Sequence, residues 1–124
     1  MAWGTVELEP EVREWLEALP TARFATVAFH IELLADKGAL LGEPHTRHLG
    51  GKLRELRFYL DRSAMRITYW IAPERRIVLL TVFRKTHMRE DREVERARRA
   101  LQRCVAQAHA VVEYDVGERE GVAE

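Results

Sequence analysis

Residues 52–89 read KLRELRFYLDRSAMRITYWIAPERRIVLLTVFRKTHMR, and this stretch decides the fold. In its first segment Leu56, Phe58 and Leu60 alternate with Glu55, Arg57 and Tyr59. Such alternation is typical of a strand that buries one face. The sequence therefore predicts a strand over residues 53–60 with one apolar and one polar side.

The same stretch contains two more strands and the turns between them. Residues 65–72 alternate in the same way, and residues 77–83 (IVLLTVF) are apolar on both faces, which is typical of a central strand. Asp61-Arg62-Ser63 suits the first turn, and Pro73-Glu74 suits the second. The stretch is therefore expected to form two consecutive β-hairpins.

Upstream of the hairpins the pattern predicts one strand and two helices. Residues 3–8 alternate as a short strand, and Pro10 suits the first turn of a helix that Pro20 ends. Thr21 is the expected N-cap of the second helix, and Gly38 is its expected left-handed C-cap. Residues 40–51 are predicted to be a loop because of their glycines, proline and polar residues.

Downstream, acidic residues at 90, 91 and 93 favour the start of a last helix, predicted over residues 90–110. The predicted order is β-α-α-β-β-β-α, a small α+β domain with a mainly antiparallel sheet and helices packed on one face. We expect a single domain over residues 1–112 and an acidic C-terminal tail over residues 113–124.

The net charge of zero conceals a strong asymmetry along the chain. Residues 45–89 contain eleven Lys or Arg and three Asp or Glu, whereas residues 1–20 contain one and five. A local excess of eight positive charges attracts polyanions over a Debye length of about 8–10 Å. The basic hairpins are therefore expected to meet a nucleic acid.

Composition and the N-terminal residues limit the cellular compartment and the cofactors that we expect. No apolar run reaches 18 residues, the N-terminus lacks the features of a secretory signal, and Cys104 is the single cysteine. We find no Cys/His spacing of the metal-binding kind. The expectation is a cytoplasmic protein without a membrane segment, a metal or another cofactor.

The polar faces of the first two hairpin strands combine cations with aromatic rings. Guanidinium groups bind phosphates in a two-point geometry, and rings stack on unpaired bases. The candidate RNA-binding residues are Lys52, Arg54, Tyr59, Trp70 and Arg84. Trp70 is equally compatible with a core position under a helix, and His45 and His48 are expected to be exposed loop residues.

Four residues are candidates for catalysis of RNA cleavage: Arg57, Arg66, Lys85 and His87. When a 2′-hydroxyl attacks its own 3′-phosphate, one group takes its proton, another protonates the leaving oxygen, and cations stabilise the phosphorane. Arg57 and Arg66 are expected to stabilise charge, because arginine stays protonated. Lys85 and His87, with Tyr59, are the candidates for proton transfer.

Three segments also resemble a known family: LGEPHTRHLGGKLRELRF (41–58), MRITYWIAPERRIVLLTVFRKT (65–86) and REDREVERARRAL (89–101). Together they resemble the RelE/HigB-type toxins of bacterial type II toxin–antitoxin modules, within the RelE/ParE superfamily and its HigB-like phage-derived branch. The matching positions are Gly42, Pro44, Leu49, Leu53, Glu55, Leu56, Arg57, Phe58, Arg66, Tyr69, Leu79, Leu80, Phe83, Lys85, Glu93 and Ala97.

This resemblance implies a metal-independent endoribonuclease, an mRNA interferase that cuts messages in the ribosomal A site and so inhibits translation. It implies neutralisation by a cognate helix-turn-helix antitoxin, in a toxin–antitoxin hetero-oligomer. By position, Arg57, Arg66 and Lys85 match the family's cationic active-site residues. Two alternatives stay open: a ParE-like toxin that inhibits DNA gyrase without cutting RNA, and an inactive toxin-fold binding module.

Overall fold

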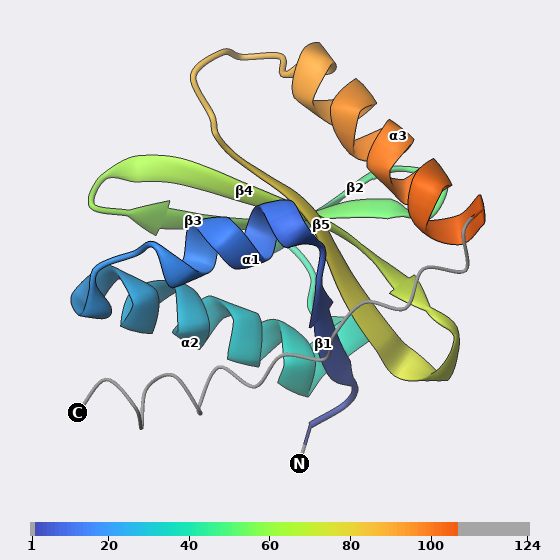
Figure 1. Cartoon of the computed structure of the whole chain (residues 1–124), viewed down its shortest axis with the longest axis horizontal. Helices are drawn as coiled ribbons and strands as arrows, with labels where there is room; N and C mark the ends of the chain where they lie inside the picture. Colours follow the sequence, from blue (N-terminus) through green and yellow to red (C-terminus); the bar gives the residue numbers. More distant parts are fainter. Residues whose placement is uncertain (1, 107–124) are drawn as a thin grey trace.

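A five-stranded sheet forms the centre of the computed structural model, which describes residues 2–106 (Figure 1). Its strands lie in the order β1-β5-β4-β3-β2; β1 runs parallel to β5 and the other neighbours are antiparallel. The strands are β1 Thr5–Leu8, β2 Thr46–Gly50, β3 Leu53–Leu60, β4 Ser63–Ala72 and β5 Arg76–Arg84. The predicted α+β class is confirmed, and so are both predicted hairpins.

The helices are α1 Pro10–Glu17, α2 Thr21–Lys37 and α3 Asp91–Ala106, with short 3-10 turns η1 Gly38–Leu40 and η2 Pro73–Arg75. Thr21 is not an N-cap: it is the first residue of α2, and Pro20 precedes it without a side-chain cap bond. Gly38 follows α2 with a φ of +53°, and a Cβ there would overlap the ring of Trp3. The close approach of this ring therefore requires glycine.

The helices cover both faces of the sheet, so the expectation of one covered face is wrong. Neighbouring residues of a strand point to opposite faces, and in β4 Tyr69 packs into the core beneath α1 and α2 while Trp70 packs beneath α3. We call these the α1–α2 face and the α3 face. Leu53, Val78 and Leu80 are apolar positions on the α3 face, and they give α3 its own small core.

The sheet also has one strand more than predicted. Residues 46–50, predicted to belong to a loop, form β2 and pair with β3 through Thr46↔Leu56 and Arg47↔Glu55. The segment TRHLG has no apolar alternation, and as an edge strand it exposes Arg47 and His48 to solvent. Thr46 is its buried anchor, and its hydroxyl donates to the Leu41 carbonyl at 2.6 Å.

The turn between β3 and β4 sets the register of the basic strands. Leu60 pairs with Ser63, so the turn consists of Asp61 and Arg62, with φ of +48° and +71°. Positive φ at both positions is typical of the two-residue hairpin turn that matches strand twist. The register that follows places Arg57 directly opposite Arg66.

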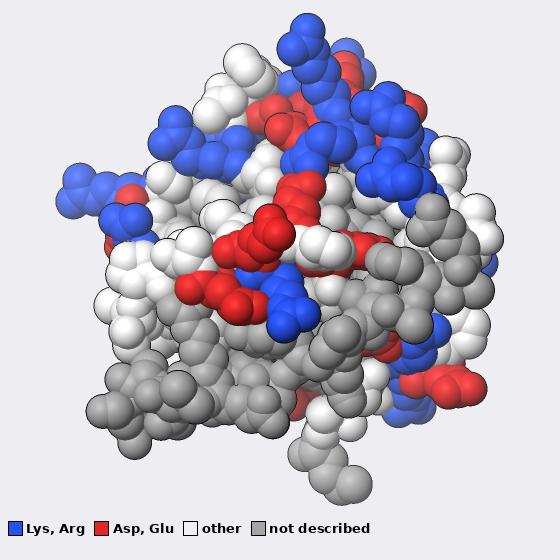
Figure 2. All heavy atoms as spheres, viewed as in Figure 1, with Lys and Arg blue, Asp and Glu red and all other residues white. Residues whose placement is uncertain are grey.

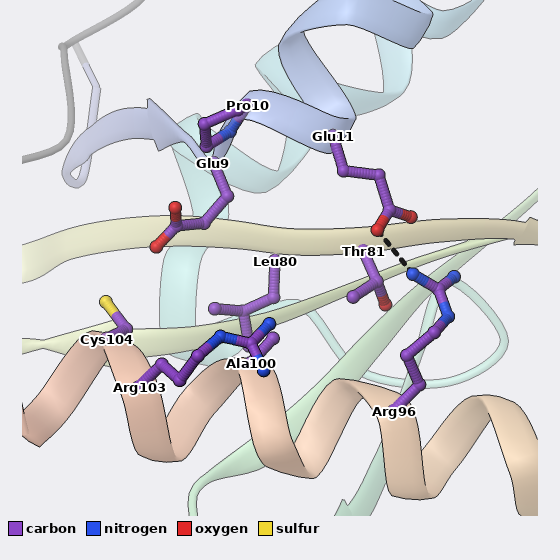
Figure 3. Close-up of a pocket in the computed structure, with 9 residues that line it drawn as sticks. All are labelled: Glu9, Pro10, Glu11, Leu80, Thr81, Arg96, Ala100, Arg103 and Cys104. Carbon is purple, nitrogen blue, oxygen red and sulfur yellow. Dashed lines mark hydrogen bonds and ion pairs between the residues drawn. The ribbon is translucent and has the colours of Figure 1, made fainter.

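Figure 3 shows α1 and α3 on either side of β5, with Glu11 of α1 and Arg96 of α3 pointing toward each other. The β1–β5 pairing ends at Leu79, so the backbone of Val82 lies beyond the last partner strand. The Glu11 carboxylate accepts from the Val82 N–H at 3.0 Å, and Arg96 donates to the Val82 carbonyl at 3.3 Å. Glu11 and Arg96 also form an ion pair with each other. These side chains replace the missing strand and fix α3 against the sheet.

The predicted last helix extends to residue 110 and the predicted tail covers 113–124, so residues 107–124 of these predictions lie outside the described part. Across residues 2–106, no helix has both the length and the apolar character needed to cross a membrane.

Candidate nucleic-acid interface

Arg57 on β3 and Arg66 on β4 form the centre of the site on the α3 face. Like charges directly opposite each other destabilise a sheet, and here Glu55 lies between them. One oxygen of its carboxylate, Oε1, is 3.8 Å from Arg57 Nε and 3.7 Å from Arg66 Nε. The side chains of Glu55 and Arg66 are 8% and 9% exposed, whereas that of Arg57 is 28% exposed. Arg57 is therefore the guanidinium that solvent reaches more readily.

Further cations surround the same carboxylate. Arg47 is the strand partner of Glu55 on β2, and Lys85 follows the end of β5. Burial raises the pKa of Glu55, while Arg66, Arg57, Arg47 and Lys85 act against that rise. We call Arg47, Arg57, Arg66 and Lys85, with Glu55 at the centre, the cationic cluster. It carries a net positive charge around one buried carboxylate.

Arg66 is the innermost cation of the cluster. Burial, followed by the charge of Arg57, lowers the pKa of its guanidinium from a very high ordinary value, and Glu55 opposes this. The group remains charged at neutral pH, because arginine titrates far above it. Its Nη1 donates to the Met65 carbonyl at 3.0 Å, which holds the guanidinium in a fixed orientation.

Of the predicted catalytic residues, Arg57 and Arg66 flank Glu55 directly, and Lys85 is near enough to lower the pKa of its carboxyl. His87 is exposed in the loop between β5 and α3, where its backbone N–H donates to Glu90 Oε1 at 2.7 Å. The Lys85 ammonium donates to the His87 carbonyl at 2.6 Å. Lys85 therefore links the cluster to this loop.

The predicted RNA-binding residues separate into two groups. Tyr59 is 71% exposed and lies near enough to Arg66 to influence its pKa. Arg54 and Arg84 pair with Tyr69 and Met65, residues of the α1–α2 core, so they are on the opposite face from the cluster. Only Tyr59 of these three shares a surface with the cationic cluster.

Trp70 and Lys52 lie at the other end of the α3 face. Trp70 is 7% exposed in the core beneath α3, and the Lys52 ammonium is 5.9 Å from the centre of its ring. A base cannot stack on Trp70 while α3 covers it. Trp70 therefore acts in the core, with Lys52 at its edge.

Sequence reasoning missed Glu55 and Arg47 as members of the site. Once Arg57 is placed opposite Arg66, a carboxylate on the same face is expected to reduce their repulsion, and Glu55 is two residues from Arg57 on the same side of β3. Arg47 had no comparable signal, because β2 was predicted to be loop.

Charge is also uneven on the surface seen in Figure 2. Lys and Arg gather where Figure 1 places α3 and the loop before it, and acidic side chains lie across the middle of the view, near α1. The exposed arginines of α3 include Arg92 and Arg99. Within residues 2–106, no group of three His, Cys, Asp or Glu side chains is arranged to hold a metal ion.

Comparison with known proteins gives a matching family and a similar fold. The sequence model of a family described as "Phage derived protein Gp49-like (DUF891)" matches residues 14–103. The structure is similar to that of a mutant of the Escherichia coli toxin RelE in its free state, with a TM-score of 0.56 and 12% sequence identity, over 83% of this chain and 98% of that chain. No curated protein sequence matches. The RelE-like fold predicted from the resemblance is confirmed.

Proposed function

The chain belongs to the family of phage-derived Gp49-like proteins, and from this premise we propose that it is the toxin of a type II toxin–antitoxin module. In this proposal it is a metal-independent endoribonuclease that cuts mRNA in the ribosomal A site and so stops translation. The family and the RelE-like fold support a toxin. The cutting of RNA is supported by the cationic cluster.

The observation that carries the proposal is the convergence of Arg57, Arg66 and Lys85 around Glu55 on one face of the sheet. Facing arginines with a lysine nearby attract a phosphate, and guanidinium groups bind its oxygens in two-point geometry. Because Arg66 is fixed by its neighbours, it stabilises charge on the phosphorane without having to reorganise. Tyr59, exposed beside it, offers a ring on which an unpaired base stacks.

Among the alternatives, the gyrase inhibitor has less support from the described residues. For a gyrase inhibitor we expect Arg57, Arg66 and Lys85 to point away from one another and the terminal helix to present an apolar face to solvent. Here Ala97, Ala100 and Cys104 of α3 are buried against the sheet, and burial raises the pKa of the Cys104 thiol. The apolar side of α3 is therefore used within the fold.

The partners follow from the proposed function. A ribosome carrying a message supplies the RNA, and a cognate helix-turn-helix antitoxin neutralises the toxin in a hetero-oligomer. An antitoxin that covers the cationic cluster would exclude RNA directly, and acidic side chains are the chemistry expected to face it. The proposed compartment is the cytoplasm, where ribosomes are present.

The test is inducible expression in bacteria, with measurement of translation and mapping of mRNA 5′ ends. Wild type is compared with Arg66→Ala and with Arg13→Ala, which removes an exposed arginine that pairs with Glu17 on α1. We expect growth arrest with new 5′ ends inside translated frames for wild type and Arg13→Ala, and neither effect for Arg66→Ala. Arrest with intact messages and blocked DNA replication would overturn the proposal.

A further inference from the structure

A cavity of about 440 Å³ opens at the edge of β3, next to the cationic cluster. Its lining includes Arg57 and Arg66 of the cluster, together with His30, His45, Phe58 and Tyr59. The volume falls in the range of about 300–1,000 Å³ that is typical of small-molecule sites. Charged, titratable and aromatic groups thus surround one space that is large enough for a nucleotide.

The position of His45 follows from where β2 begins. The β2–β3 pairing starts at Thr46↔Leu56, and the residue before it continues along the edge of β3. The His45 carbonyl accepts the N–H of Arg57 at 2.8 Å, so these two residues are neighbours across the sheet edge. The His45 side chain is exposed and lines the cavity. A phosphate bound by Arg57 would therefore lie close to the His45 imidazole.

His30 on α2 forms the opposite wall. Its ring stacks on Phe58, with centroids 5.0 Å apart and 19° between planes, and meets Phe29 edge-on at 5.3 Å. Burial, followed by the charge of His45, lowers the pKa of His30. The ring contacts with Phe58 and Phe29 hold the His30 ring in place as part of the lining.

We propose that the cavity receives the nucleotide that reacts, and that His45 is the catalytic residue that removes the proton from its 2′-hydroxyl. This inference rests on the proposed function and names the general base of the same site. The titratable and charged groups that share the cavity with His45 are His30 from α2, Arg57 and Tyr59 from β3, and Arg66 from β4.

In the proposed step the 2′-hydroxyl attacks the phosphate on the neighbouring 3′ oxygen. The 2′ oxygen forms a bond to phosphorus while its proton moves to the His45 imidazole, and Arg57 and Arg66 stabilise the negative phosphorane. The bond from phosphorus to the 5′ oxygen breaks, and that oxygen takes its electron pair and then a proton from water. The products are a 2′,3′-cyclic phosphate and a 5′-hydroxyl, and the imidazolium returns its proton to the hydroxide that is formed.

The geometry favours His45 over the candidates from the loop after β5. The backbone N–H of His87 is bonded to Glu90, and the Lys85 ammonium donates to the His87 carbonyl. Neither residue lines the cavity, whereas His45 shares it with both arginines. An imidazole is also the side chain that most often serves as a general base in enzymes.

The experiment measures single-turnover cleavage of a message on purified ribosomes between about pH 5.5 and 8.5. His45→Asn is compared with wild type and with His48→Asn, a matched control on β2 whose exposed ring bonds to the Gly51 carbonyl at 2.7 Å. Loss of a general base lowers rates by about 10²–10⁴-fold. We expect this loss for His45→Asn, together with loss of the rise in rate with pH, and wild-type behaviour for His48→Asn.

Binding to ribosomes that carry an uncleavable 2′-deoxy message separates catalysis from binding, and it should be unchanged in His45→Asn. Thermal unfolding checks the fold, and His45→Gln replaces the first variant if that variant misfolds. Wild-type rates and pH dependence in the variant would overturn the role of His45 and leave the proposed function intact. If His45→Asn lost ribosome binding in proportion to its loss of cleavage rate, the role of His45 as a general base would also be overturned. If wild type did not cut the message, both this role and the proposed function would be overturned.

Discussion

Glu55→Gln tests whether the carboxylate at the centre of the cationic cluster stabilises the fold. In wild type its Oε1 lies 3.7 Å from Arg66 Nε and 3.8 Å from Arg57 Nε. At an effective dielectric constant of about 20, each pair at this distance gives roughly 4 kcal/mol of gross attraction. Burial of a carboxylate costs several kcal/mol, and both distances exceed those of a hydrogen bond. The two effects are thus of comparable size.

The direction of the pKa shift decides which effect is larger. Burial raises the pKa of Glu55 above its ordinary 4.5 despite the surrounding cations. The folded protein therefore binds this proton more tightly than the unfolded chain does. The stability that the group contributes is fully present below the unfolded pKa, and it is lost as pH rises through the folded pKa. At neutral pH the charged carboxylate is a net cost.

We therefore expect Glu55→Gln to be at least as stable as wild type at pH 7. The variant's advantage in unfolding free energy over wild type should grow as pH rises from about 4 to 8. The gain is about 1.4 kcal/mol for each unit by which the pKa of Glu55 in the folded protein exceeds its pKa in the unfolded chain. In a chain of this length 1 kcal/mol corresponds to roughly 3–5 °C in Tm. Thermal and urea unfolding at several pH values measure the difference.

Glu7→Gln is the matched control on the same face. Glu7 accepts two hydrogen bonds from Arg76, at 2.7 and 3.0 Å, and hydrogen bonds to charged groups contribute about 1.5–3 kcal/mol. This variant should lose stability at pH 7, unlike Glu55→Gln. If Glu55→Gln were less stable than wild type at pH 7, and this loss of unfolding free energy became smaller on acidification, the ion pairs of Glu55 would outweigh the cost of its burial.

Two further predictions concern the scaffold. Glu11→Ala and Arg96→Met should each destabilise the protein by about 1–3 kcal/mol, because each removes a side chain that bonds to the Val82 backbone and leaves its former partner unsatisfied. Urea unfolding of the double variant should show coupling of at least about 0.5 kcal/mol, and additive losses would exclude a shared network. Gly38→Ala should lower the free energy of unfolding by more than about 2 kcal/mol, because φ is positive at this position and the Trp3 ring occupies the space of a Cβ. Gly42→Ala should change it by no more than about 0.5 kcal/mol, because no atom lies within 4 Å of a Cβ there. Equal Tm values for the two variants would contradict this.

The central strands could be predicted from sequence because their burial is periodic. Leu56, Phe58 and Leu60 follow one face of β3, and β5 is apolar on both faces because helices cover both. Apolar residues on both faces of β5 already implied that both faces of the sheet are covered. The prediction of helices on one side did not take it into account.

The remaining differences arise from contacts that are distant in the sequence. β2 has no alternation of its own and exists because Arg47 and its neighbours pair with β3. Trp70 fits the polar side of β4 by its position, yet its surroundings are set by α3, about 30 residues later. The facing positions of Arg57 and Arg66 follow from the hairpin register, and their catalytic role stays a prediction. The position of Arg54 and Arg84 on the other face also required the register.

In the proposed function the cationic cluster cuts RNA through attack by a 2′-hydroxyl. The most direct measurement incubates the purified protein with ribosomes that carry a message in the A site, and analyses the ends of the fragments. We expect fragments that end in a 2′,3′-cyclic phosphate and a 5′-hydroxyl, with no cut by Arg66→Ala and none in a message that has a single 2′-deoxy nucleotide at the cleavage site. Cleavage of the 2′-deoxy message at the same rate, or an intact message while translation stops, would contradict it.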